Sequence, residues 1–317
     1  MKARNTTVDL LRTIGLFLVI AAHCSFPEWF IQVRNFDVVL LMFLSGMSFG
    51  LSDHAGSGGW KTYAVHRFRR LVLPVWMFLI GFFVVFALLG RTFSLYEIAE
   101  SFLLLHGGVL FVWVYRVFFV SSLLNPFLKK LTEKADNLKL LIGSAAVLLL
   151  NDLLYQLLWM NIPHVGRILV YLITYSAAYG SVSFLGILYL KLNQKERIVM
   201  ILLFAGLFVI SGIILGFPDF YSMKYPPSVY YVSYGLFWSG LLLEIGSHHP
   251  LPSAIQPIIT WFSRETMNIF IWQIPFYYLA DTFFPDFMGN PAFFLFLLGG
   301  GSVCAWLQSL FPKRKKL

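Results

Sequence analysis

Residues 71–90 read LVLPVWMFLIGFFVVFALLG, a run of twenty residues without one charged side chain. About 20 apolar residues in a helix span the hydrocarbon core of a bilayer, so this run is expected to be a transmembrane helix. The whole chain has the same character, because 58% of its residues are hydrophobic and only 12% are charged. Soluble proteins carry about 25% charged residues. The composition therefore excludes a soluble enzyme, a disordered chain and a nucleic-acid-binding module.

Similar apolar segments recur along all 317 residues, with no internal repeat and no low-complexity linker between them. The predicted fold is an all-α polytopic membrane protein, with about ten transmembrane helices in one bundle. Residues 1–317 are expected to form a single integral membrane domain. The expected spans cover residues 8–26, 36–52, 71–90, 109–128, 140–160, 167–190, 198–216, 227–246, 257–280 and 291–311.

The distribution of basic residues predicts the orientation in the membrane. If both termini are cytoplasmic, 19 of the 24 Lys and Arg residues fall in inner segments. Such an excess is typical of cytoplasmic loops. We therefore expect a multi-pass protein of the cell inner membrane with both termini in the cytoplasm, and residues 53–70 as an inner loop along the membrane surface. Arg116 falls within a span, and the outer basic residues are Arg34, Arg91, Arg167 and Lys224.

The first expected helix concentrates ionisable side chains, which are costly inside a bilayer and persist mainly when they are paired or functional. Arg12 and His23 are eleven residues apart, which in a helix places them on one face about 16 Å apart along the axis. Asp9 is positioned to pair with Arg12 at i,i+3. A histidine exchanges protons near neutral pH, so His23 is a candidate general base. Taken singly, Arg12 also fits a boundary residue and His23 a hydrogen-bonded interface histidine.

Three stretches carry a resemblance to a known family. NTTVDLLRTIGLFLVIAAHC at 5–24 contains Arg12 followed after ten residues by His23, FLSGM lies at 43–47, and HRFRRLVLPVW lies at 66–76. Together they resemble the membrane acyltransferase-3 family. VWVYRVFFVSSLLNPFL around Trp113 and FSRETMNIFIWQIPF in a late span extend the similarity over the chain.

The resemblance implies an O-acetyltransferase that moves an acetyl group from cytoplasmic acetyl-CoA to a hydroxyl of an envelope saccharide or glycolipid. A sugar hydroxyl needs a base as it attacks a thioester, a role that suits His23. CoA phosphates favour guanidinium groups, which Arg67, Arg69 and Arg70 supply. These three also fit an ordinary charge run at the inner boundary. Arg12 either holds Asp9 and orients the helix or helps to hold the acyl donor.

Substrate contacts are expected from Arg116 and Gln273. Gln273 stands where the family's late helix commonly has a histidine, and its amide can bind a hydroxyl or a carbonyl but cannot transfer protons. Asp152 and Glu244 could form an internal ion-pair network with Arg116 or line a substrate path, and they fit boundary or packing positions equally well.

The remaining motifs point to structure. Ser45 and Gly46 are small residues of the kind that allow close helix approach. His248 and His249 lack a third ligand at helical spacing, so no metal site is expected. Cys24 and Cys304 lie in apolar runs, which argues against a disulfide.

Two rival functions are open at this level. A transporter or flippase for an envelope precursor also suits ten helices with buried charges, and Pro126 and Pro275 are compatible with broken helices around a midplane site. No inverted repeat supports it. A subunit that only scaffolds a polysaccharide synthase would show neither acyl transfer nor transport.

Overall fold

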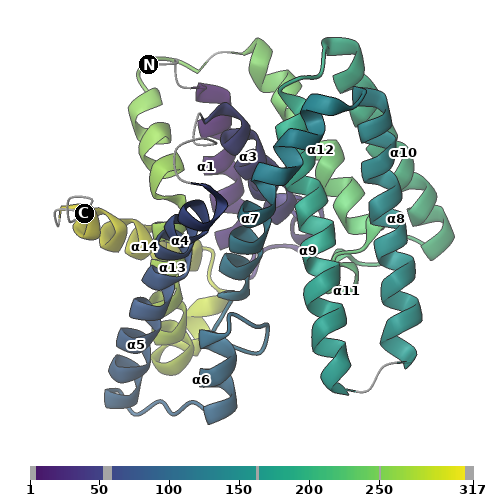
Figure 1. Ribbon diagram of the computed structural model, residues 1–317. Helices are drawn as coiled ribbons and strands as arrows, with labels where there is room; N and C mark the ends of the chain where they lie inside the picture. The colour runs from purple at the N-terminus through teal and green to yellow at the C-terminus, as the bar shows by residue number, and fades with distance from the viewer. Residues whose placement is uncertain (1–4, 53–58, 162–163, 250, 311–317) are drawn as a thin grey trace. The chain divides into compact units, whose positions relative to one another are not determined.

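The computed structural model describes residues 5–52, 59–161, 164–249 and 251–310. Within these ranges the chain is helical and contains no strand (Figure 1), so the predicted all-α fold is confirmed. In the described part of the chain, six helical segments are long and apolar enough to cross a membrane, as expected of a multi-pass membrane protein. They are Glu28–Leu51, Gly59–Leu88, Asn137–Leu158, Leu169–Tyr189, Gln194–Leu215 and Ala292–Leu310.

The chain divides into two compact units, which are described separately. Unit 1 comprises Met1–Ile31, Leu73–Val114 and Pro250–Leu317, and unit 2 comprises Gln32–Val72 and Tyr115–His249. The helices of unit 1 are α1 (Thr6–Ala21), α5 (Leu73–Leu88), α6 (Leu95–Phe102), α13 (Gln256–Phe283), the 3-10 turn η1 (Pro285–Gly289) and α14 (Ala292–Leu310). Those of unit 2 are α3 (Asp37–Leu51), α4 (Gly59–Leu71), α7 (Trp113–Lys134), α8 (Asn137–Asn161), α9 (His164–Tyr189), α10 (Gln194–Leu215), α11 (Phe220–Lys224) and α12 (Val229–His248). The short α2 (Glu28–Val33) crosses the boundary, and α7 begins two residues before it.

Unit 1 is built on α13, which packs against α1 and α14. Thr13 of α1 donates a hydrogen bond to the carbonyl of Ile259 at 3.2 Å, and the ring of Phe17 meets that of Phe262 edge-on at 5.1 Å. On the other side, Gly301 of α14 lies so close to α13 that an added Cβ would be 2.9 Å from the Ile269 carbonyl oxygen. The long α13 is therefore fixed on both flanks.

Unit 2 depends on the close packing of α3 against α9. A Cβ at Gly46 would overlap the Ser183 carbonyl, and a Cβ at Gly186 would overlap the Phe43 carbonyl. Small residues that bring helix backbones together are the usual contact surface in membranes. The prediction that Gly46 permits close approach is thus confirmed. In Figure 1, α8, α9, α10 and α12 run side by side in this unit.

The predicted inner loop at 53–70 is wrong over most of its length, because α4 begins at Gly59. Residues 53–58 lie outside the described part of the chain. Trp60 donates a hydrogen bond to the carbonyl of Leu123 at 3.2 Å, and Tyr63 donates one to the carbonyl of Ser122 at 3.0 Å. These bonds to α7 hold the segment as a helix, and they cannot be read from a polar composition.

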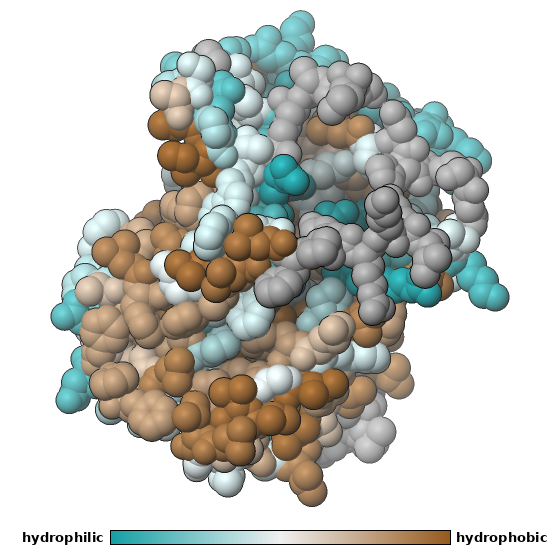
Figure 2. Space-filling model, turned by 90° about the vertical axis from the view of Figure 1, so that its left-hand side faces the viewer, coloured by the Kyte–Doolittle hydropathy of each residue, from teal (hydrophilic) through white to brown (hydrophobic). Residues whose placement is uncertain are grey.

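Large apolar side chains cover outer faces of both units. On α5, Met77 and Leu88 are 67% and 84% exposed, and on α10 Ile214 is 76% exposed. Figure 2 shows extensive brown, apolar patches on the face in view. Exposed apolar area on this scale is unusual for a soluble protein and suits contact with lipid.

We expect Gly46→Ala and Gly186→Ala to destabilise the protein, because each new methyl group must displace a backbone carbonyl of the facing helix. Overpacking of this kind typically costs about 1–3 kcal/mol. Thermal unfolding of the purified protein in detergent measures the effect. Gly143→Ala is the matched control, since a Cβ there meets nothing within 4 Å. Equal melting temperatures for all three variants would contradict the close-packing account.

Candidate active site

His23 lies just beyond the C-terminal end of α1, in a tight turn. The sequence predicted that this helix continues to residue 26, but it ends at Ala21. The amide of Ala22 donates to the carbonyls of both Leu18 and Val19. The amide of His23 donates to the carbonyl of Ile20 at 3.0 Å. Such three-residue bonds tighten a last turn and end a helix. His23 thus stands on a turn rather than on the helical face shared with Arg12.

An aromatic cradle holds the His23 imidazole. The ring stacks on Phe111 with centroids 4.0 Å apart and meets the edge of Tyr277 of α13 at 6.3 Å. Phe111 has φ +61°, a conformation that is strained for a bulky residue and that clusters at functional sites. Its ring placement therefore depends on the surrounding contacts.

Those contacts come from the segment 103–112, between α6 and α7. The amide of Val109 donates to Ser101 Oγ at 2.7 Å, and the amide of Leu110 donates to the Tyr278 hydroxyl of α13 at 3.4 Å. At Gly108 an added Cβ would lie 2.6 Å from the backbone of Ser101, so the segment is pressed onto α6. The result is a fixed wall beside His23 that supports Phe111.

Gln273 lies on α13, four residues before Tyr277 and so on the same helix face. Its side chain is only 1% exposed. Among the described residues, neither Oε1 nor Nε2 finds a hydrogen-bond partner. Buried polar atoms are nearly always satisfied, so a free amide here is suited to an incoming hydroxyl or carbonyl.

Asp9 is buried at 3% exposure and anchors α1 to α13. Ser263 Oγ donates a hydrogen bond to Asp9 Oδ1 at 2.6 Å, a contact that the sequence did not suggest. The predicted pairing of Asp9 with Arg12 stays a prediction. Arg12 is partly buried on the same helix. Asp9, Arg12, His23 and Gln273 all belong to unit 1.

The three predicted CoA-binding arginines lie in the second half of α4, in unit 2. Arg69 and Arg70 are exposed, whereas Arg67 is partly buried. Arg67 Nε donates to the Tyr63 hydroxyl at 2.9 Å, and the guanidinium lies 5.1 Å from the centre of that ring. Since Tyr63 is itself bonded to Ser122, Arg67 is the oriented member of the three.

Arg116, near the start of α7, is buried at 9% exposure against the rings of Tyr171 and Tyr175. Both of its Nη atoms lack hydrogen-bond partners among the described residues. The two acidic residues considered as its partners bond to other groups of unit 2. Asp152 accepts a hydrogen bond from the amide of Val229, the first residue of α12. Glu244 accepts one from Tyr189 at 2.6 Å and pairs with Arg197 at 3.5 Å.

Two side chains of unit 1 were missed by sequence reasoning. Phe111 carries no sequence signal of its own. His106 lies in the segment 103–112, and the centre of its ring is 4.2 Å from that of Trp113. The run His106-Gly107-Gly108 is the sequence feature from which this segment could have been recognised. No group of three potential metal ligands occurs among the described residues.

Comparison with protein-family models identifies the family of this chain. The chain matches the acyltransferase domain of the acyltransferase 3 family over residues 5–309. The chain belongs to the acyltransferase 3 family. Comparisons with curated proteins and with solved structures give no match. The match includes every candidate residue named above and confirms the resemblance carried by 5–24, 43–47 and 66–76.

We expect Ser263→Ala to destabilise the acyltransferase, because it removes the hydrogen bond that Ser263 donates to the buried carboxylate of Asp9. A hydrogen bond to a charged group contributes about 1.5–3 kcal/mol, so its loss is measurable as a lower melting temperature. Ser302→Ala in α14 is the control, since its buried hydroxyl has no partner among the described residues. A loss in Ser302→Ala as large as in Ser263→Ala would refute the anchoring role of Asp9.

Proposed function

We propose that the protein is a membrane O-acyltransferase that moves an acetyl group from cytoplasmic acetyl-CoA to a hydroxyl of an envelope saccharide of the exopolysaccharide, capsule or O-antigen type. The observation that carries this proposal is the His23 imidazole, held between Phe111 and Tyr277 in a chain of the acyltransferase 3 family. Residues 1–317 act as one domain in this proposal.

In the proposed reaction, His23 removes the proton of the acceptor hydroxyl as its oxygen attacks the thioester carbonyl. A new C–O bond forms, the C–S bond breaks, and the imidazolium returns the proton to the leaving sulfur. The products are an acetyl ester and free CoA thiol, so no other reactant is needed. Asp9, bonded to Ser263, fixes α1 and thereby the turn that carries His23. Arg12 either supports Asp9 or contacts the donor.

The donor is assigned to the basic end of α4. Arg67 is oriented by Tyr63, which leaves its Nη groups for phosphate oxygens, and the exposed Arg69 and Arg70 add positive charge. Guanidinium groups bind phosphates through charge-assisted hydrogen bonds. We infer that this end of α4 and both termini lie on the cytoplasmic side of the cell inner membrane. This inference comes from the distribution of basic residues along the chain.

Gln273 of unit 1 is proposed as an acceptor contact, and Arg116 of unit 2 is proposed separately as a second candidate. Each carries buried hydrogen-bonding atoms without partners among the described residues. A saccharide hydroxyl is both a donor and an acceptor, so it satisfies the Gln273 amide. The tyrosines under Arg116 offer flat, partly apolar faces for a sugar ring.

We expect His23→Ala to lower acetyl transfer by roughly 10²- to 10⁴-fold, the usual worth of a positioned general base. The variant should fold and bind acetyl-CoA normally. Thiol release from acetyl-CoA and O-acetyl NMR signals on envelope glycans of complemented deletion cells measure the loss. His249→Ala, at an exposed position, is the control. Wild-type transfer by His23→Ala would remove His23 from the chemistry.

We expect Arg67→Gln to weaken acetyl-CoA binding by roughly ten- to a hundred-fold, because it removes a charge-assisted contact. Arg70→Gln should have a smaller effect, since Arg70 has no orienting bond among the described residues. Isothermal titration in nanodiscs gives both affinities. Lys195→Gln, an exposed position at the start of α10, serves as the matched charge control. If both arginine variants bind like Lys195→Gln, the donor site is not at α4.

A further inference from the structure

The segment 103–112, which holds Phe111 against His23, has strained backbone near both of its ends. Leu104 has φ +55° and Phe111 has φ +61°, in the left-handed region that residues with large side chains rarely adopt. Such conformations persist only where the surrounding structure over-determines them. The contacts of this segment therefore decide where the Phe111 ring lies.

The first half of the segment is fixed by α6. An added Cβ at Gly107 would overlap the carboxylate of Glu100, and the amide of Val109 donates to Ser101 Oγ at 2.7 Å. Both contacts precede Phe111 by at least two residues. They anchor the segment, but they do not by themselves set the direction of the ring.

Tyr278 of α13 meets the segment directly beside Phe111. Its hydroxyl accepts a hydrogen bond from the amide of Leu110 at 3.4 Å. The tyrosine is only 7% exposed, and its ring lies 5.2 Å and 5.9 Å from the rings of Phe82 and Phe86 of α5. Because the ring is held on its sides, its hydroxyl fixes the chain one residue away from Phe111.

Arg91 holds the face of the Tyr278 ring. Its guanidinium lies 4.5 Å from the ring centre, and its Nη1 donates to Asp281 Oδ2 at 2.6 Å and to Thr282 Oγ1 at 2.8 Å. A cation over an aromatic face is attracted to it. Arg91 is 27% exposed, and exposed ion pairs add little stability. The specific effect of this pair is thus to keep the cation over Tyr278.

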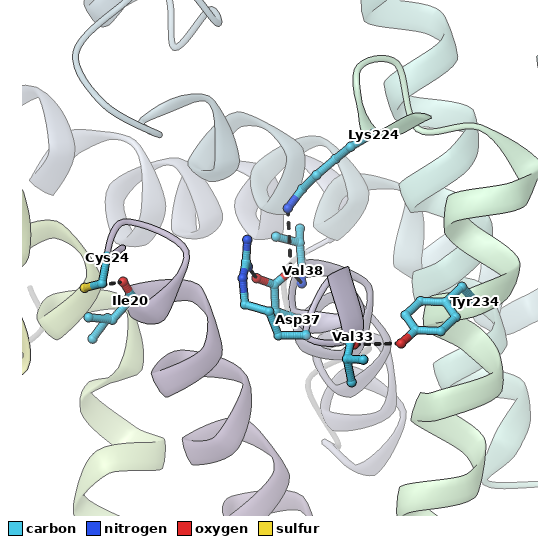
Figure 3. Close-up of polar contacts among 8 residues, drawn as sticks. Ile20, Cys24, Val33, Asp37, Val38, Lys224 and Tyr234 are labelled. Atoms are coloured by element: carbon cyan, nitrogen blue, oxygen red, sulfur yellow. Dashed lines mark hydrogen bonds and ion pairs between the residues drawn. The ribbon is translucent and has the colours of Figure 1, made fainter. Parts of the chain in front are cut away.

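The backbone of the turn that carries His23 is held separately, within the end of α1. Cys24 Sγ donates to the carbonyl of Ile20 at 3.6 Å (Figure 3), and the amide of His23 donates to the same carbonyl. The imidazole plane, in contrast, follows the Phe111 ring on which it stacks. A change at Tyr278 should therefore alter the imidazole and leave the turn in place.

We propose that Tyr278 is a positioning residue of the acyl-transfer site. Its hydroxyl, with Arg91 against its ring, holds the segment 103–112 so that Phe111 keeps the His23 imidazole in the orientation for proton transfer. This inference rests on the proposed function, because it takes His23 as the base. All four residues belong to unit 1. A merely structural role for the hydroxyl, that of satisfying a backbone amide, would affect stability and leave His23 unchanged.

Tyr278→Phe tests the proposal, because it removes the hydroxyl and keeps the packed ring. The first readout is NMR of the full-length protein in nanodiscs with labelled histidine, where the His23 signal is the one that His23→Ala lacks. A proton over the face of an aromatic ring is shielded, so we expect the signal to move downfield when the stacking on Phe111 is lost.

Tyr234→Phe is the matched control. It removes another tyrosine hydroxyl that bonds to the backbone, since Tyr234 of unit 2 donates to the Val33 carbonyl at 2.7 Å (Figure 3). This variant should lower the melting temperature and leave the His23 signal in place.

The second readout is acetyl transfer to envelope glycan from deletion cells. In Tyr278→Phe we expect kcat to fall roughly ten- to a hundred-fold, the effect of a small misplacement of a catalytic group, with the KM for acetyl-CoA unchanged. If Tyr278→Phe does not fold, Arg91→Met decides by the same two readouts, because it keeps the hydroxyl and removes the cation from the ring.

An unmoved His23 signal in folded Tyr278→Phe, or a moved signal with wild-type kcat, would overturn the proposal. The NMR readout needs neither acetyl-CoA nor acceptor, so it tests the positioning of His23 independently of acyl transfer. Wild-type transfer by His23→Ala would instead count against the proposed function.

Discussion

Hydrocarbon offers no hydrogen bonds, so every polar group buried in a membrane protein must be satisfied from within. The chain meets this constraint at several points between distant segments, where Asp9 accepts from Ser263, Asp152 accepts from the amide of Val229 and Glu244 accepts from Tyr189. Against this background, Gln273 and Arg116 are exceptions among the described residues. We propose that a ligand supplies the missing partners, since such costly groups are kept mainly where they are paired or functional.

Rigid packing fixes the side chains of the candidate active site in unit 1. In unit 1, α13 is held by α1 and α14 and presents Gln273 and Tyr277 on one face. The segment 103–112 is bonded to α6 and α13, and it supports the strained Phe111 against His23. A base acts efficiently only when its geometry is fixed before the substrate arrives. The contacts that stabilise the unit are thus the ones that position the imidazole.

Composition predicted the all-α membrane fold, and small residues predicted the close approach at Gly46. The family was predicted from the resemblance of the stretches 5–24, 43–47 and 66–76 to its members. Sequence reasoning could not predict contacts between segments far apart in the chain, such as Asp9 with Ser263 or His23 with Phe111. It also expected a loop where α4 forms, because the bonds of that helix to α7 leave no trace in a polar run. Periodicity describes one helix at a time, whereas a site is built from several.

We propose that the buried polar groups of this protein serve acyl transfer rather than transport. The most direct measurement follows thiol release from acetyl-CoA and the appearance of O-acetylated saccharide with purified protein in proteoliposomes, alongside counterflow of the same saccharide. We expect one thiol to be released for each acetyl ester formed. Saccharide counterflow without any consumption of acetyl-CoA would contradict it.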